Sequence, residues 1–226
     1  EMADRPWSPP ARHWPDRPDV VAGRDDLAGG TWLGMNEAGV VAGVLNRRNT
    51  LGPQPGKRSR GELALDALDF PDAADAVEML LQLDAHAFRP FNMVVADNRD
   101  AFWLRNLGQK VEAEKLPPGL SMVTASDRND LNSRRIGWFL PRWQAAAVPD
   151  PQTGDWGTWE ELLSDRGHDP SGTVFDAMSI ISNTGFGTVS SSLIALPAPQ
   201  FAARRPVWRF VGGRPDKASL WTQVEL

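Results

Sequence analysis

The stretch from Gly29 to Glu62 constrains the fold most strongly, because it joins two short apolar runs by a tight polar connection. The runs are Thr31 to Met35 and Val40 to Asn46. Between them, Asn36 can cap a type I turn and Gly39 tolerates a positive φ. This pattern predicts a β-hairpin. The second run is apolar at nearly every position, which is typical of a strand covered on both faces.

The second run ends in Asn46-Arg47-Arg48-Asn49. It would therefore deliver an amide and two guanidinium groups to the exposed end of a buried strand, which is a common support for a site. The alternative is a solvated turn. Because a shift of one residue exchanges the two faces of a strand, the sequence does not decide which of Arg47 and Arg48 faces a cleft.

Composition excludes several classes of protein. The 226 residues fit one large domain or two small ones, and 41% hydrophobic residues suffice for a core. The net charge is -5 and no run of Lys and Arg exceeds two residues, so a nucleic-acid partner is not expected. No apolar stretch approaches the roughly 18 residues of a membrane span, and these residues contain no hydrophobic region of a signal peptide, so we expect a cytoplasmic protein.

Familiar chemical motifs are absent from the chain. There is no cysteine, which excludes disulfides, thiolate metal sites and a cysteine nucleophile within these residues. His13, His86 and His168 lie far apart without ligand spacing, so no metal site is expected. Ser190 to Ser192 would need a base to act as nucleophiles, and a polar strand face is the simpler interpretation.

The order of elements predicts an α+β architecture with antiparallel sheets, in a single domain over residues 1–226. Residues 1–28 are rich in Pro and are expected to form an extended arm. Ser59 and Glu62 match a capping box that begins a helix, and Pro71 begins a second helix. Further strands are expected at 91–97, 101–105, 110–116, 120–125, 186–196, 206–211 and 220–224, with helices from 132 or 133, kinked or ended by Pro141, and at 156–163.

A series of short motifs resembles the NRDE family, the relatives of transport and Golgi organisation protein 2. The motifs occur in the family's order and span almost the whole chain: Glu1 with Arg5-Pro6, Gly30-Thr31-Trp32-Leu33-Gly34, Asn46, Arg60-Gly61-Glu62, Phe91-Asn92 with Asp97, and Gly185-Phe186-Gly187-Thr188. Glu1 corresponds to the last letter of the family's Asn-Arg-Asp-Glu motif. We therefore expect that residues beginning Met-Cys precede Glu1.

The resemblance implies an N-terminal-nucleophile hydrolase-like fold, a four-layer αββα sandwich of two mainly antiparallel sheets. The hairpin is also similar to that of the choloylglycine and penicillin V acylase group, in which Asn46 falls on an oxyanion-hole Asn. The implied activity is hydrolysis of an amide C–N bond by an N-terminal Cys outside this chain, with Glu1 in the segment that positions it. The chain departs from the pattern at Ala125-Ser126, in place of a second Asn, and at Val189, in place of an Arg.

Two other functions stay open. The resemblance also implies non-catalytic binding and trafficking of haem or acyl-CoA and lipid, for which no cofactor is required and haem is itself a candidate ligand. The candidate ligand-binding residues are Arg47, Arg48, Arg60, Trp32 and Asn36, with the arginines pairing with propionates or phosphates. A solvated face paired with Asp and Glu is the alternative for the arginines. A purely structural or partner-binding module is the third possibility, and Gly30-Thr31 is an alternative autoprocessing bond.

Overall fold

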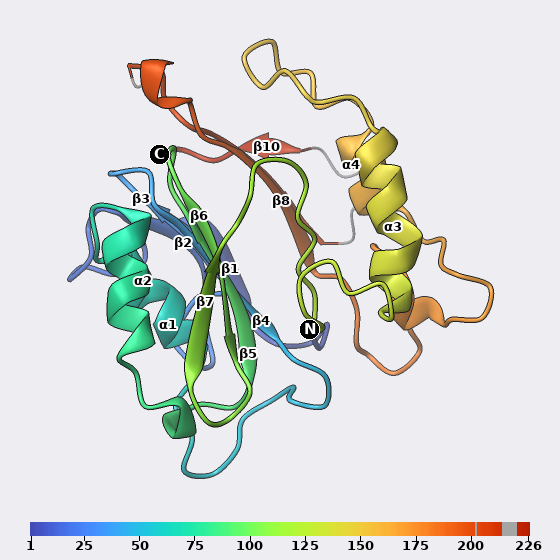
Figure 1. The fold of residues 1–226 in the computed structure, drawn as a ribbon, viewed down its shortest axis with the longest axis horizontal. Coiled ribbons are helices and arrows are strands. Elements are labelled where there is room, and N and C mark those ends of the chain that lie inside the picture. The colour runs from blue at the N-terminus through green and yellow to red at the C-terminus, as the bar shows by residue number, and fades with distance from the viewer. Residues whose placement is uncertain (202, 214–220) are drawn as a thin grey trace. The chain divides into compact units, whose positions relative to one another are not determined.

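The computed structural model describes residues 1–201, 203–213 and 221–226, which form two compact units. The larger unit contains Pro6–Arg128, Leu196–Pro206 and Leu226, and the smaller unit contains Glu1–Arg5, Asn129–Ala195 and Val207–Glu225. Each unit is built on one antiparallel sheet (Figure 1). The expected α+β class with two mainly antiparallel sheets is confirmed.

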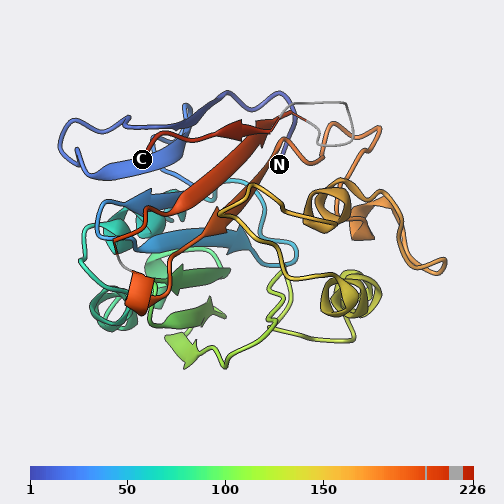
Figure 2. The same cartoon turned by 90° about the horizontal axis from the view of Figure 1, so that it is seen from above.

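The sheet of the larger unit has seven strands that follow one another in chain order, as Figure 2 shows from the blue β1 to the yellow-green β7. Every neighbouring pair is antiparallel, and every connection is short except the one from β4 to β5, which spans residues 47–90. The strands are β1 (Trp7–Ala11), β2 (Val20–Asp25), β3 (Leu33–Asn36), β4 (Val41–Asn46), β5 (Phe91–Ala96), β6 (Ala101–Asn106) and β7 (Val111–Lys115).

The predicted hairpin is confirmed as β3 and β4. Gly39 has φ +88°, and the Asn36 side-chain oxygen accepts a hydrogen bond from the Val40 N–H at 2.9 Å. Gly43 pairs with Leu33, and a Cβ at Gly43 would lie 3.3 Å from Leu33 Cδ1, so the glycine leaves room for the Leu33 side chain.

Residues 1–28 were expected to form an extended arm, but two stretches of them are paired strands. β2 is buried at Val20, Val21 and Ala22, which explains why this stretch joins the sheet. β1 is the edge strand, and its register shifts between Ser8 and Ala11. This irregularity accommodates the two prolines between them, because Pro cannot donate to a ladder.

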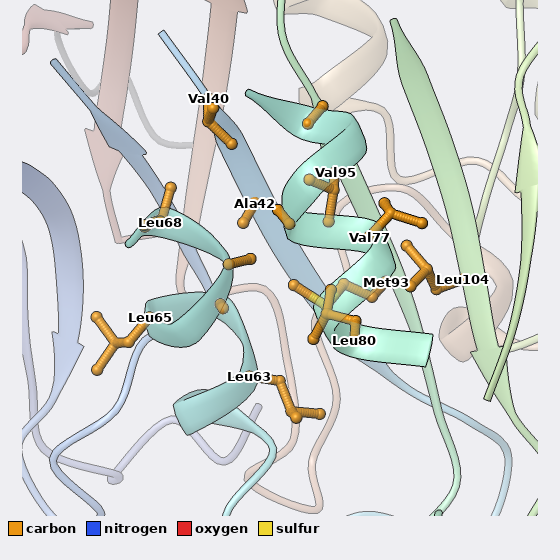
Figure 3. Packing of buried hydrophobic residues seen from close by; sticks show 14 of the residues in the cluster. Val40, Ala42, Leu63, Leu65, Leu68, Val77, Leu80, Met93, Val95 and Leu104 are labelled. Carbon is orange, nitrogen blue, oxygen red and sulfur yellow. The ribbon is translucent and has the colours of Figure 1, made fainter. Parts of the chain in front are cut away.

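Helices α1 (Gly61–Leu68) and α2 (Ala73–Leu81) pack on one face of this sheet, followed by the short 3-10 helix η1 (Ala85–Ala87) (Figure 1). Figure 3 shows apolar side chains of both helices and of the strands in one cluster, among them Leu63, Leu80, Met93 and Leu104. Each of these side chains is fully buried. Burial of one such side chain contributes about 1.5–3 kcal/mol to folding.

Both helices begin differently from the prediction. Ser59 Oγ accepts from the Gly61 N–H at 3.2 Å and the Glu62 carboxylate pairs with Arg58 at 2.7 Å, so the capping box does not form. Asp72, rather than Pro71, marks the start of α2, because its carboxylate accepts from the Asp75 N–H. The residue patterns correctly predicted the two helices but not the groups that cap them.

The predicted strand at 120–125 is wrong, since this segment is a loop. The side-chain amide of Asn92 donates to the carbonyls of Thr124 and Ser126, at 2.8 and 2.7 Å. These side-chain bonds take the place of a strand ladder at the end of the segment.

The smaller unit contains a three-stranded sheet in the order β10-β9-β8. Its helix α3 continues through Pro141, which does not end it, and the rings of Trp143 and Trp159 meet edge to face with centroids 5.2 Å apart. The predicted strand at 220–224 begins outside the described residues, and β10 lies within its described part. The elements are β8 (Ser190–Ala195), β9 (Val207–Gly212), β10 (Thr222–Gln223), α3 (Arg134–Ala145), α4 (Trp159–Ser164) and η2 (Val174–Asp176), while η3 (Pro199–Phe201) belongs to the larger unit.

Candidate functional site

Asn46 is the last residue of β4, where antiparallel pairing holds it opposite Phe91. Its side chain is half-buried and makes no hydrogen bond to any residue that the structure describes. The amide therefore keeps two donors and an acceptor for another group. Because the backbone is fixed by the ladder, these donors are presented by a rigid support.

The two sides of the sheet separate Asn46 from Arg47. Side chains that face each other across a ladder share one face, so Asn46 shares the face of Phe91, which belongs to the core beneath α1 and α2. Leu45 shares the opposite face with Asn92. Arg47 reaches that opposite face, because its Nη1 donates to Asn92 Oδ1 at 2.7 Å.

Asn92 is the centre of a buried hydrogen-bond network. Its side chain is fully buried within β5, and its oxygen accepts from both Arg47 Nη1 and, at 3.3 Å, Trp103 Nε1. Its two N–H groups donate to the carbonyls of Thr124 and Ser126. The amide thus uses both donors and the acceptor, and it fixes the loop after β7 to the end of β4.

Arg47 continues into a chain of ion pairs. Its Nη2 lies 2.7 Å from Asp127 Oδ1, an ion pair without a well-aligned hydrogen bond, and the other Asp127 oxygen accepts from Arg105 at 2.7 Å. Arg105 also donates to Glu112 at 3.0 Å. Hydrogen bonds from Lys110 and then Arg105 lower the pKa of the Glu112 carboxyl, and the bond to Glu112 raises the pKa of Arg105. The guanidinium of Arg47 is therefore held in one position.

Arg48 differs from Arg47 in its surroundings. It is exposed, and its one side-chain contact in the described ranges is from Nε to Ser126 Oγ at 3.4 Å. No carboxylate among the described residues pairs with it. Arg48 is thus the cation next to the end of β4 that can pair with an external anion.

Three other predicted ligand-binding residues have structural partners within the larger unit. Asn36 donates to the carbonyls of Leu68 and Phe70 at 2.9 and 2.7 Å, which ties the hairpin to the end of α1. Arg60 donates to the Thr50 carbonyl at 2.8 Å and to the Pro90 carbonyl at 3.1 Å. These hydrogen bonds give the side chains of Asn36 and Arg60 a structural role within the larger unit.

Trp32, the third of them, packs on the edge of the sheet. A Cβ at Gly23 would lie 2.5 Å from the Trp32 ring, so the ring occupies the space that glycine leaves on β2. The ring also meets Trp7 edge to face, with centroids 6.0 Å apart.

Glu1 belongs to the smaller unit, where the structure brings it together with the distant segment 185–188. The Gly187 N–H donates to the Glu1 carbonyl at 2.8 Å, and Met2 pairs with Phe186 in an isolated antiparallel bridge. Two of the motifs that carry the family resemblance thus lie side by side, although more than 180 positions separate them in the chain.

The sequence did not lead us to predict Asn92 and Asp127 as parts of this network. A signal was present for Asn92, which is the one polar residue in the run Phe91-Asn92-Met93-Val94-Val95. Buried polar side chains are nearly always hydrogen-bonded, so such a residue indicates a network. Nothing local marks Asp127, whose partners lie on β6 and after β4.

The comparison with protein families identifies the chain. The family model described as Transport and Golgi organisation 2 matches residues 1–143. The chain belongs to this family. The match includes the β3–β4 hairpin, Asn46, the Asn92 network and both helices of the larger unit, and it confirms the resemblance that the short motifs indicated.

Two solved structures are similar to the chain at low identity. One is penicillin V acylase from Agrobacterium tumefaciens, 15% identical, with a TM-score of 0.46, covering 91% of this chain and 73% of that one. The other is a mutant of conjugated bile acid hydrolase from Clostridium perfringens, 13% identical, with a TM-score of 0.47, covering 92% of this chain and 81% of that one. No curated protein sequence gives a significant match.

The described residues contain neither a candidate metal site nor a candidate membrane span. No group of three or more His, Cys, Asp or Glu side chains in these ranges could hold a metal ion. No helix within them combines the length and the apolar character that crossing a bilayer requires.

Proposed function

We propose that this member of the family is an amide hydrolase in which Asn46 donates a hydrogen bond to the oxyanion. The observation that carries the proposal is the Asn46 amide, which has no partner among the described residues and stands at the end of a strand fixed on both sides. Donors that are held in place before the reaction stabilise developing charge without reorganisation.

The proposed reaction uses a nucleophile outside this sequence, a Cys at the mature N-terminus as the family resemblance implies. Its α-amino group takes the thiol proton, the thiolate attacks the amide carbonyl, and the carbonyl oxygen gains negative charge. The Asn46 N–H groups stabilise that oxygen. Arg47, held by Asn92 and Asp127, fixes the chain that follows Asn46 and so keeps the donor in place.

The test compares the full-length protein, including the residues before Glu1, with its Asn46→Ala variant on a panel of acyl amides. Loss of one oxyanion donor typically lowers kcat by about 10²–10³-fold, and we expect an effect of this size. Asn98→Ala is the matched control, because it removes an amide from the turn at the opposite end of β5. Equal turnover by wild type and Asn46→Ala, or no turnover of any amide by wild type, would contradict the proposal.

A second function is favoured by Arg48, an exposed guanidinium with no carboxylate partner among the described residues. We propose binding of an anionic ligand, either haem through its propionates or an acyl-lipid through its phosphate. The Arg48 guanidinium can form hydrogen-bonded ion pairs with carboxylate and phosphate oxygens. None of the residues described around Asn46 and Arg48 is a histidine that could bind iron. The proposed contact is therefore with the haem propionates rather than with the metal.

Haem titration tests this second function. Saturable binding with a Soret shift in the micromolar range, abolished by Arg48→Gln, would support it. Arg99→Gln is the control, since it removes an exposed arginine from the turn between β5 and β6. An unchanged haem spectrum, together with no binding of acyl-CoA measured by calorimetry, would exclude it.

A further inference from the structure

The turn that follows Asn46 is closed by one buried hydroxyl group. Thr50, which is 9% exposed, donates through Oγ1 to the Arg47 carbonyl at 2.8 Å, and its N–H donates to the same carbonyl at 3.2 Å. Asn49 lies inside this turn with φ +61°, in the left-handed region that asparagine tolerates better than most residues. The backbone therefore has a defined conformation directly after the last residue of β4.

A single guanidinium group holds this turn beside the neighbouring strand. Arg60, at the start of α1, donates from Nη1 to Thr50 Oγ1 at 2.9 Å and from Nη2 to the Thr50 carbonyl at 2.8 Å. Nη1 also donates to the Pro90 carbonyl at 3.1 Å, and Thr50 Oγ1 lies 3.2 Å from the same carbonyl. Because Thr50 follows β4 and Pro90 precedes β5, these bonds join the two chain segments beyond the end of the β4–β5 ladder.

Asn46 lies at this joined end of the ladder. It forms the last residue pair between β4 and β5 with Phe91. Strand ends open by local fluctuation more readily than strand centres, and the bonds of Thr50 oppose such opening on the C-terminal side of Asn46. A donor that stabilises a developing charge must keep its direction, and a displacement of about 1 Å can lower the rate about 10²-fold.

We propose that Thr50 is a positioning residue for the Asn46 amide. Its hydroxyl group fixes the Arg47 carbonyl, and thereby the direction of the chain that leaves Asn46, while Arg60 fixes Thr50. The inference rests on the amide hydrolase function proposed above, since Thr50 acts on the reaction only through the Asn46 donor.

Steady-state hydrolysis of acyl amides by the full-length protein tests the proposal with Thr50→Val, which keeps the shape of the side chain and removes the hydroxyl group. We expect kcat to fall about tenfold with KM unchanged, because the donor acts on the transition state. Thr50→Ser keeps the hydroxyl group and should restore most of the wild-type kcat. Thr153→Val is the matched control and should leave kcat unchanged, because Thr153 Oγ1 donates to the Asp150 carbonyl in a turn of the same spacing.

A double-mutant cycle separates positioning from a general effect on the fold. In the Asn46→Ala background, Thr50→Val should change kcat less than about twofold, because the group that Thr50 positions is gone. Arg60→Lys, which keeps the charge but loses the planar fork, should give the same pattern if Thr50→Val does not fold. A tenfold loss in both backgrounds, an effect on KM alone, or an unchanged kcat in Thr50→Val would each overturn the proposal.

Failure of the proposed hydrolase function is recognised separately, because wild type would then hydrolyse no amide. In that case, ¹⁵N relaxation of the Asn46 side-chain amide tests the positioning without turnover. Asn46 should be more ordered than Asn98, whose side chain makes no hydrogen bond to any described residue, and Thr50→Val should lower the Asn46 order parameter. Equal order parameters of Asn46 in wild type and Thr50→Val would contradict the assignment of Thr50.

Discussion

Asparagine and arginine side chains of the larger unit divide into those that support the fold and those available to a ligand. Asn92 and Asn36 use their amides entirely within the larger unit, while Asn46 has no partner among the described residues. The same contrast separates Arg47, which pairs with Asp127, from the exposed Arg48. Residue type alone does not distinguish the members of either group.

Replacing Asn92 by Leu should strongly destabilise the protein. The change keeps the volume of the side chain but leaves the Thr124 and Ser126 carbonyls and Trp103 Nε1 without their partner. Unsatisfied buried groups cost about 1–3 kcal/mol each, so we expect the free energy of unfolding to fall by at least about 2 kcal/mol.

Urea denaturation of Asn92→Leu measures this loss, and Asn98→Ala is the control for removing an amide next to β5. The control should change stability little, because no hydrogen bond from the Asn98 side chain is present among the described residues. An Asn92→Leu variant as stable as the control would show that the network contributes nothing.

At the level of elements, the approach of α1 to the β3–β4 hairpin depends on two glycines. A Cβ at Gly30 would lie 2.6 Å from the Gly61 carbonyl carbon, at the start of α1. The Thr31 N–H donates to the Gly61 carbonyl at 3.1 Å, and Thr31 is 1% exposed with its hydroxyl bonded to the Leu33 carbonyl. These contacts favour an intact hairpin over the alternative of an autoprocessing bond at Gly30-Thr31.

Gly30→Ala should therefore destabilise the protein through a steric clash. The added methyl group meets backbone atoms, which cannot move aside as a flexible side chain can, and overpacking of this kind costs about 1–3 kcal/mol. Gly137→Ala is the matched control, because a Cβ at this position of α3 would lie 3.4 Å from its nearest neighbour, the Leu131 carbonyl oxygen. In thermal unfolding, Gly30→Ala should melt lower than wild type and Gly137→Ala should not.

At the scale of the whole molecule, acid stability depends on carboxylates that the fold holds ionised. Asp97 is the clearest case. Burial opposes ionisation of Asp97, but hydrogen bonds from the N–H groups of Ala73, Asp100 and Arg99 outweigh it and lower the pKa below the usual 3.8. The side chain joins the β5–β6 turn to the start of α2.

The sign of this pKa shift fixes the pH dependence of stability. Because the folded-state pKa is depressed, the contribution of Asp97 is complete above the unfolded value of 3.8 and is lost as the pH falls through the lower folded value. Asp97→Asn should reduce stability at neutral pH and flatten the fall of stability on the acid side. Denaturant titrations between about pH 2 and 7 measure this. Asp4→Asn, an exposed change of equal charge, should keep the wild-type slope.

The sequence by itself determined the elements whose signal is local. The β3–β4 hairpin, the β5–β6 hairpin, α1 and α2 follow from apolar periodicity and turn residues within a few positions, and the ordered motifs were sufficient to indicate the family. Local patterns succeed here because hydrophobic burial acts on each strand or helix face separately.

Only the tertiary structure decided which polar groups meet. Asn92 and the Thr124 carbonyl are 32 positions apart, and they meet at the end of a segment that is a loop where a strand was predicted. Asp127 binds Arg47 and Arg105, which come from two different strand ends. A hydrogen bond depends on distance and direction in space, which the spacing of residues along the chain does not specify.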